Sequence, residues 1–225
     1  MNITTDRRSF IHATSVTVLT AAAYSRVLGA NERVALGLIG YGLIGKTHTA
    51  TFSKIPACQI VGVADCHRKR ADQGVTAVGD GATAYQDFRK LLDCKDVQAV
   101  IVATPDHWHA LQAIEAMKSG AHVYLQKPIS VDVIEGEAIL AAARKYKRKC
   151  QIGTQRKSTP HLIEAKKRVI DSGLLGKISH AEVCCYYHMR ANGNPPEEAV
   201  PDFFNYEMWT GPAPLRPYDG LPHTR

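Results

Sequence analysis

The chain has 225 residues, enough for one complete domain and part of another. Hydrophobic residues make up 45% and charged residues 22%, the composition of an ordinary globular protein. The net charge is +7, but the basic residues fall into short separate clusters, so nucleic acid is not the expected partner. Six cysteines form no C-x-x-C pair, which argues against a zinc ribbon or a thioredoxin-type site.

Residues 1–30 have the pattern of an export leader. Arg7 and Arg8 precede Phe10, Ile11 and the apolar run 13–23, which is too short to span a bilayer. The arginine pair resembles the twin-arginine export signal. We therefore expect an exported, periplasmic protein without a membrane span. A chance basic pair in the tail of a cytoplasmic protein is the alternative.

A nucleotide-binding unit is predicted to begin with residues 34–40, a continuous apolar run typical of a strand buried on both faces. The turn after this strand opens a helix that ends near residue 54, and such a turn holds a pyrophosphate on exposed N–H groups. It matches G-x-G-x-x-G and consists of Gly40, Tyr41, Gly42, Leu43, Ile44 and Gly45.

The next apolar strand, residues 59–65, ends in Asp65, about 20 residues after the glycines. A carboxylate there accepts hydrogen bonds from the ribose hydroxyls and repels a 2′-phosphate, so NAD is expected rather than NADP. Arg68 follows closely and could bind a phosphate, which leaves NADP as the alternative. The other alternative is that Asp65 caps a helix and binds no ligand.

Three further strands are predicted at residues 98–104, 122–126 and 150–155, with helices between them. This alternation predicts an α/β fold: a doubly wound parallel sheet, the Rossmann type, over residues 31–153. Ligands bind beyond the carboxyl ends of such strands. The candidate residues there are Thr104, Pro105, His109, Gln126, Lys127, Gln155 and Arg156. His107 and His109 lack a third ligand at a useful spacing, so no metal is expected.

The stretches GLIGYGLIG, VGVAD, ATPDHWHA, HVYLQKPIS and NYEMWTGPAPLRPY resemble, in the same order, the Gfo/Idh/MocA family of oxidoreductases. The resemblance covers residues 33–220. It implies hydride transfer between NAD(P) and a hydroxyl-bearing carbon of a sugar or polyol. It also implies that Lys127 is the catalytic residue and helps to position the substrate hydroxyl. Thr104, Pro105 and His109 match the segment along the nicotinamide half of the cofactor.

The chain departs from the family pattern in two ways. Gln126 stands where glutamate often precedes the Lys-Pro pair, so the lysine lacks an anionic neighbour at that position. The family's downstream histidine, a usual acid/base, has no counterpart before Arg225. We therefore expect a C-terminally truncated chain that binds cofactor and has weak or no activity alone. A non-catalytic dinucleotide binder or redox sensor is the main alternative, and a methyltransferase is the third.

Residues 154–225 are expected to begin an α+β open-sheet domain that binds substrate and mediates oligomerisation. A helix is predicted over residues 159–172, and alternation predicts a half-buried strand over residues 178–189. One strand cannot form a stable sheet and has too few partners to bury its apolar face. We therefore expect a mobile or aggregation-prone end beyond about Tyr187. Homo-oligomers are expected only for a longer form.

Overall fold

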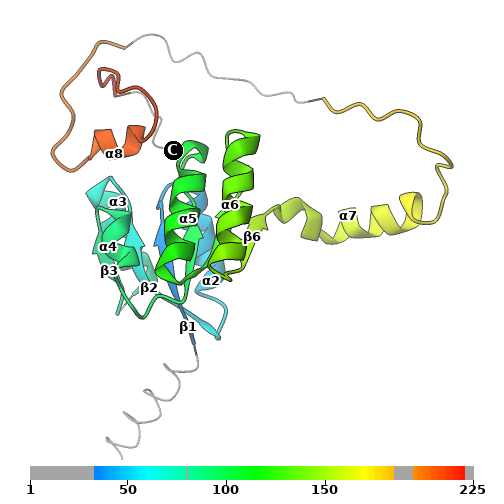
Figure 1. Ribbon diagram of the computed structural model, residues 1–225, viewed down its shortest axis with the longest axis horizontal. Coiled ribbons are helices and arrows are strands. Elements are labelled where there is room, and N and C mark those ends of the chain that lie inside the picture. The colour runs from blue at the N-terminus through cyan, green and yellow to red at the C-terminus, as the bar shows by residue number, and fades with distance from the viewer. Residues whose placement is uncertain (1–32, 80, 185–194, 221–225) are drawn as a thin grey trace, which may run out of the picture.

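The computed structural model describes residues 33–79, 81–184 and 195–220, so the expected leader lies outside the described residues. Six parallel strands form one sheet in the order β3-β2-β1-β4-β5-β6 (Figure 1). The chain reverses direction across the sheet between β1 and β4, the position at which such sheets bind ligands. The strands are β1 (Val34–Ile39), β2 (Cys58–Ala64), β3 (Thr83–Tyr85), β4 (Ala99–Val102), β5 (His122–Gln126) and β6 (Cys150–Gly153).

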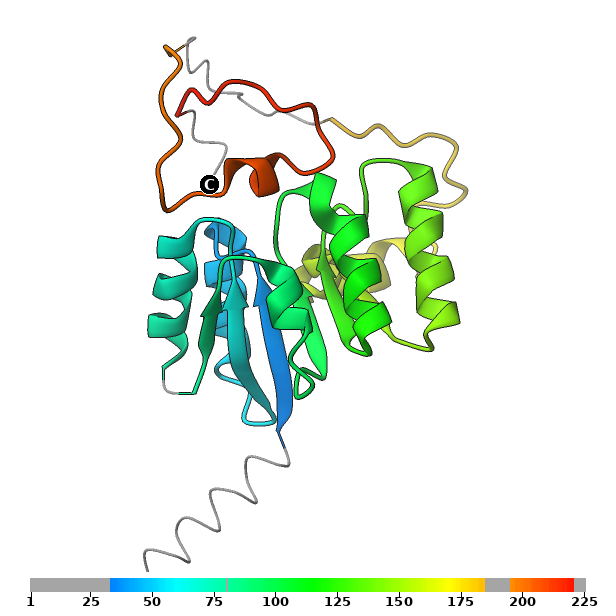
Figure 2. The same cartoon turned by 60° about the vertical axis from the view of Figure 1, so that its left-hand side comes forward.

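Helices cover both faces of the sheet, as predicted for a doubly wound fold. Helix α2 contacts α3, whereas α5 contacts both α4 and α6 on the opposite face (Figures 1 and 2). The Rossmann prediction is therefore confirmed. The helices of this unit are α2 (Leu43–Phe52), α3 (Arg68–Val78), α4 (Phe88–Leu92), α5 (His109–Ser119) and α6 (Val133–Lys145), and the short 3₁₀ turn η1 (Asp106–Trp108) precedes α5.

The apolar core has two layers, one on each face of the sheet. Successive residues of β4 alternate between them: Val100 and Val102 pack with α5, and Ile101 packs with the layer under α2. All three side chains are at most 1% exposed. Alternation of this kind follows from the two-residue period of a strand, and it explains why β4 reads as a continuous apolar run.

The chain after β6 is mostly exposed. Helical turns follow as η2 (Gln155–Ser158), α7 (Pro160–Ala165) and the π-helical η3 (Lys166–Ile170), close to the predicted helix. Residues 178–184 form no strand, contrary to the expectation for 178–189, and the rest of that range lies outside the described residues. Alternation alone does not make a strand, and the described residues offer 178–184 no neighbouring strand for hydrogen bonds.

The chain then returns to the sheet. This return was not predicted from the sequence. Helix α8 (Tyr206–Thr210) lies beyond the carboxyl ends of the strands, next to α3 (Figure 1). Arg68 N donates to Phe203 O at 2.8 Å, and Asn205 N donates to Cys66 O at 2.9 Å. The expectation of too few partners beyond Tyr187 is therefore wrong for residues 203–205, whose backbone bonds to the loop after β2.

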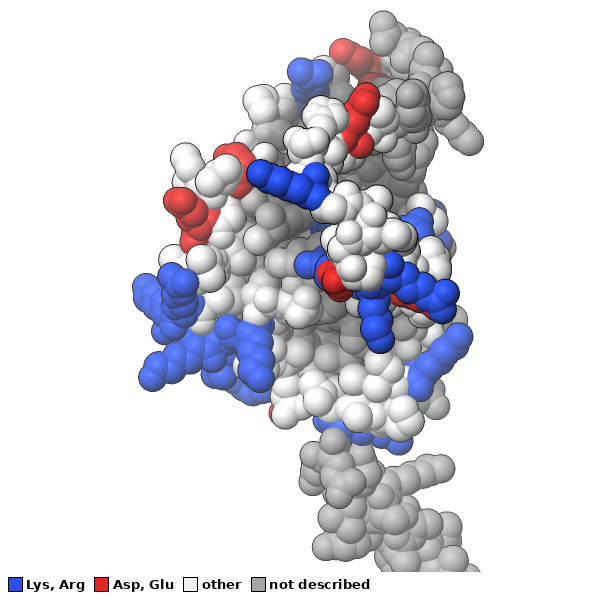
Figure 3. All heavy atoms as spheres, turned by 90° about the vertical axis from the view of Figure 1, so that its right-hand side faces the viewer, with Lys and Arg blue, Asp and Glu red and all other residues white. Residues whose placement is uncertain are grey.

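Among the described residues, no helix combines the length and apolar character needed to cross a bilayer. Figure 3 views the molecule from the side of α7 and shows basic side chains in separate groups with uncharged surface between them. This face offers no continuous basic stripe of the kind that follows a nucleic-acid backbone.

Candidate functional site

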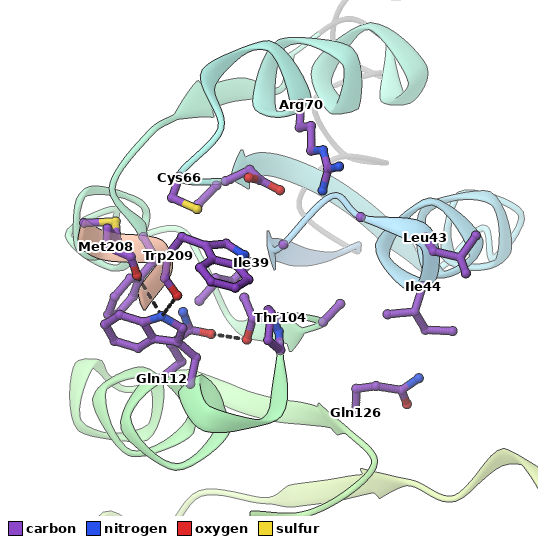
Figure 4. A pocket seen from close by; sticks show the side chains of 18 of the residues that line it. Ile39, Leu43, Ile44, Cys66, Arg70, Thr104, Gln112, Gln126, Met208 and Trp209 are labelled. Carbon is purple, nitrogen blue, oxygen red and sulfur yellow. Dashed lines mark hydrogen bonds between the residues drawn. The ribbon is translucent and has the colours of Figure 1, made fainter. Parts of the chain in front are cut away.

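A cavity of about 440 Å³ lies at the carboxyl ends of β1, β2, β4 and β5 (Figure 4). These are the central strands of the sheet, so the cavity straddles the reversal point between β1 and β4. The predicted residues that line it are Gly40, Gly42, Leu43, Ile44, Asp65, Thr104, Pro105, Gln126 and Lys127. The structure therefore brings most of the candidate residues to one site.

The glycine-rich turn is built for close backbone packing. Gly40 has φ of +92°, and a Cβ there would lie 2.8 Å from Ala103 O. A Cβ on Gly45 would collide with Gly40 O. Gly45 does not line the cavity, so its role is to bring α2 close to β1, as the motif requires. Tyr41 does not line the cavity either, because its ring is buried in the core beside Val63.

The start of α2 differs from the starts of α4 and α6. Asp87 caps α4 and Asp132 caps α6, each through a hydrogen bond from a backbone N–H to the side chain. Helix α2 begins after Gly42 with no side-chain cap and no acidic residue in its first turn. Gly42, Leu43 and Ile44 line the cavity, so the first N–H groups of α2 are available to an anionic ligand there. A pyrophosphate fits this arrangement.

Asp65 is fixed at the end of β2 by two backbone hydrogen bonds. Tyr41 N donates to Oδ2 and His67 N donates to Oδ1, both at 2.8 Å. Each oxygen keeps a lone pair for a further donor, such as a ribose hydroxyl. Arg68 does not line the cavity, whereas Arg70 does, so the cationic side chain beside Asp65 is not the predicted one.

His109 lies behind the cavity and does not line it. It is 1% exposed, with Nδ1 2.6 Å from Pro128 O and Nε2 3.0 Å from Thr104 O. The ring therefore joins the loop after β4 to the loop after β5. The predicted cofactor contact is corrected to a positioning role, because both ring nitrogens already face backbone oxygens.

Lys127 occupies the rim of the cavity at the end of β5, with an exposed side chain. Its backbone N donates to Gln126 Oε1 at 3.0 Å, and Gln155 Nε2 donates to the same oxygen at 2.8 Å. The peptide bond between Lys127 and Pro128 is cis. Gln126 thus holds the backbone of the lysine, and Gln155 supports Gln126 instead of reaching the cavity. Arg156 is exposed and does not line the cavity.

Several lining residues were not anticipated from the sequence. Thr104 Oγ1 donates to Gln112 Oε1 at 2.7 Å, which places two polar groups on the cavity wall. The lining residues that the sequence reasoning missed include Cys66, Arg70, Gln86, Phe88, Trp108, Gln112, Met208 and Trp209. The stretch Trp-Thr-Gly-Pro, residues 209–212, was the available sequence signal for the last two.

Cys66 is not a nucleophile at neutral pH. Burial, together with the neighbouring Asp65 charge, raises the pKa of its thiol to about 12. The protonated thiol therefore contributes an apolar wall and no thiolate chemistry. In the described part of the chain, no group of three or more His, Cys, Asp or Glu side chains could hold a metal ion.

The family model described as "Oxidoreductase family, NAD-binding Rossmann fold" matches residues 34–154, which contain all the strands of the sheet. The chain belongs to this family, Gfo/Idh/MocA. This membership identifies NAD as the cofactor, and the glycine-rich turn and Asp65 line the cavity where such a fold binds it. They also decide against a methyltransferase.

Relatives of this Gfo/Idh/MocA chain match it over the same region. An uncharacterized oxidoreductase, YrbE, from Bacillus subtilis is 30% identical and covers 64% of this chain; the match spans 42% of YrbE. An inositol 2-dehydrogenase from Salmonella typhimurium is 29% identical, over 63% of this chain and 42% of its own. The chain thus spans about two fifths of the length of the curated relatives it matches.

A solved structure shares the fold. Scyllo-inositol dehydrogenase from Lactobacillus casei, with bound NAD(H) and scyllo-inositol, has a TM-score of 0.60 and 25% identity. The match covers 65% of this chain and 43% of that one. It supports the assignment of the sheet and its flanking helices to a Rossmann domain.

Proposed function

We propose that this domain belongs to an NAD-dependent oxidoreductase that transfers a hydride between the cofactor and a hydroxyl-bearing carbon of a sugar or polyol. One observation carries the proposal. The uncapped start of α2, the Asp65 carboxylate and Lys127 line the same cavity, at the carboxyl ends of β1, β2 and β5. Together they supply an anion site, a ribose-binding acid and a basic side chain at the rim.

Each group has a distinct task in this proposal. The N–H groups of α2 bind the pyrophosphate, and Asp65 accepts from the adenosine ribose. Bound NAD accepts or supplies the hydride. Lys127 lies two strands farther along the sheet, where it orients the substrate hydroxyl and exchanges its proton. The hydrogen bonds through Gln126 fix the backbone of Lys127, which limits the positions that the amine can take.

The activities of the relatives support a polyol as the substrate class. Inositol 2-dehydrogenase is among the curated relatives, and scyllo-inositol is bound in the L. casei structure. A ring with several hydroxyls suits a rim that carries a lysine and amide side chains. The direct experiment is to measure NADH binding to this chain, and then NAD reduction by inositols and hexoses in a longer form of the protein. Failure of NADH to bind would contradict the proposal.

We also propose export through the twin-arginine route. The support is the sequence of residues 1–23, in which Arg7 and Arg8 precede an apolar run. Fusion of residues 1–32 to a reporter, compared with an Arg7→Lys/Arg8→Lys version, tests this. Export of both fusions, or of neither, would contradict the proposal.

The second candidate function is dinucleotide binding without catalysis. Within residues 33–79, 81–184 and 195–220, no carboxylate or histidine forms an ion pair or hydrogen bond with the Lys127 ammonium. Lys127 alone provides one group that can carry a proton, without a second acid or base to exchange it with. Tight NADH binding with no turnover of any polyol by the longer form would favour this candidate.

A further inference from the structure

Residues 203–211, here called the α8 cap, are tied to both loops that flank one end of the cavity. On the β2 side, Arg68 N donates to Phe203 O and Asn205 N donates to Cys66 O, at 2.8 and 2.9 Å. His67 and Phe204 form an antiparallel bridge, and Lys69 Nζ lies 3.8 Å from the centre of the Phe203 ring. Polar and aromatic contacts therefore hold the first half of the cap.

The loop after β4 holds the second half of the cap. Trp108 Nε1 donates to Met208 O at 2.8 Å, and His107 Nε2 lies 2.9 Å from Trp209 O. Gly211 has φ of +59° and packs against the Trp108 indole, so that a Cβ there would lie 2.7 Å from Trp108 Cε2. The cap thus has a defined seat, and Phe204 and Thr210 are each only 6% exposed.

These contacts place Trp209 of the α8 cap at the adenosine end of the cavity. Met208 and Trp209 line the cavity together with Cys66, the residue after Asp65. Figure 4 shows Trp209 pointing into the cavity near Cys66 and away from Gln126. An acid at the end of β2 binds the adenosine ribose in this fold, and Lys127 lies beyond β1 and β4 at the other end.

We infer that the α8 cap forms the adenine subsite of the cofactor cavity, with the Trp209 indole as the aromatic contact for the adenine ring. This inference rests on the proposed function, because it requires a dinucleotide in the cavity. Tyr206 stacks on Trp209 at an interplanar angle of 14° and holds the indole in place. Arg70 lines the same end and offers a planar cation to a purine or a phosphate.

The test is a calorimetric titration of the chain with NADH, ADP-ribose and reduced nicotinamide mononucleotide. Trp209→Ala should weaken binding of NADH and ADP-ribose about tenfold, the lower part of the range for loss of a base–aromatic stack. Binding of the mononucleotide, which has no adenine, should not change. Trp209→Phe, which keeps an aromatic face, should remain within about threefold of the unmodified chain.

A matched pair of glycine variants tests the seat without altering a lining residue. Gly211→Ala places a side chain against Trp108 and should weaken ADP-ribose binding as Trp209→Ala does. Gly176→Ala imposes similar backbone strain, with φ of +61°, at a site with nothing within 4 Å of the added atom. It should leave binding unchanged. Should Trp209→Ala fail to fold, by circular dichroism, this pair and Trp209→Phe decide the question.

The outcomes separate the two proposals. An unmodified chain that binds no NADH contradicts the proposed function itself. Normal NADH binding with equal ADP-ribose affinity in Trp209→Ala overturns the adenine subsite alone. Tighter ADP-ribose binding in Trp209→Ala also overturns it, because the indole would then occupy the space that adenine needs.

Discussion

The two ends of the cavity differ in how completely the described residues build them. At the β2 end, Asp65 has two backbone hydrogen bonds, and the α8 cap closes over Cys66. At the β5 end, Lys127 is exposed, and the chain after β6 is exposed as well. In the proposed function, cofactor binding and hydride transfer therefore fall at different ends of the cavity. The described residues build the binding end more fully than the reactive end.

The largest expected effect concerns the reactive end. In a longer form with activity, Lys127→Ala should lower turnover by roughly 10²–10⁴-fold, the usual contribution of a positioned acid–base group. The NADH dissociation constant should change little, because Lys127 lies away from the pyrophosphate and ribose groups. Lys118→Ala, which removes a surface ion pair with Glu115, is the control. Full turnover by the Lys127 variant would remove this lysine from the mechanism.

At the binding end, NADH binding should be lost when a side chain blocks access to the backbone N–H groups of α2. Gly42→Val should weaken NADH binding by at least about a hundredfold, because the side chain would keep the phosphates from the first N–H groups of α2. Loss of two hydrogen bonds to an anion costs about 3 kcal/mol or more. The thermal unfolding temperature should show that the variant still folds. Normal NADH titration by a folded variant would argue against the anion site at α2.

Cofactor choice should depend on Asp65. The unmodified chain should bind NADH more tightly than NADPH, and Asp65→Ser should shift the ratio of the two dissociation constants about tenfold toward NADPH. The reason is the loss of a charged acceptor for the ribose hydroxyls and of its repulsion for a 2′-phosphate. Glu115→Ser, on the surface of α5, serves as the control. Equal affinities for both cofactors before substitution would contradict the assignment.

A smaller effect concerns the pH dependence of the stability of the fold that carries both ends of the cavity. His48 is 6% exposed between the rings of Phe52 and Tyr124, and burial lowers its pKa below 6.5. The unfolded chain therefore binds more protons below about pH 6.5, so stability is fully present above that pH and falls as the pH drops toward the folded-state pKa. His67, whose pKa is also lowered by burial, acts in the same direction.

Replacement of His48 separates its share of that pH dependence. His48→Phe should flatten the decline in unfolding free energy between pH 7.5 and about pH 5, measured by urea denaturation. The exposed His161→Phe should leave the slope unchanged. A slope identical in the His48 variant would show that this histidine is not forced to remain neutral in the fold.

The sequence predicted the parts of the fold that carry strong local signals. The apolar runs of β1, β2, β4 and β5 and the glycine-rich turn were found where the structure has them. Strand β3 has only three residues, and helix α8 only five, too few for a hydrophobic period to appear. Both are formed through tertiary contacts that a local pattern does not contain.

The location of the site at the ends of the strands was predicted correctly, but the side chains that line it were predicted less well. Arg68 and Arg70 both follow Asp65 within a few residues. Helix α3 begins at Arg68, so the two side chains are separated by about 200° around the helix. Only Arg70 faces the cavity. His109 is correctly placed near Thr104, yet its ring binds backbone oxygens, a distinction that requires the position of the loop after β5.

The difference between the two ends is tested most directly by measuring the binding of the adenosine part and of the nicotinamide part of NADH separately. Calorimetric titration of the unmodified chain with ADP-ribose and with reduced nicotinamide mononucleotide measures each end separately. We expect ADP-ribose to retain most of the affinity of NADH and the mononucleotide to bind far more weakly, because the β2 end holds the anion site, Asp65 and the α8 cap. Equal binding of the two halves, or binding of the mononucleotide alone, would contradict this expectation.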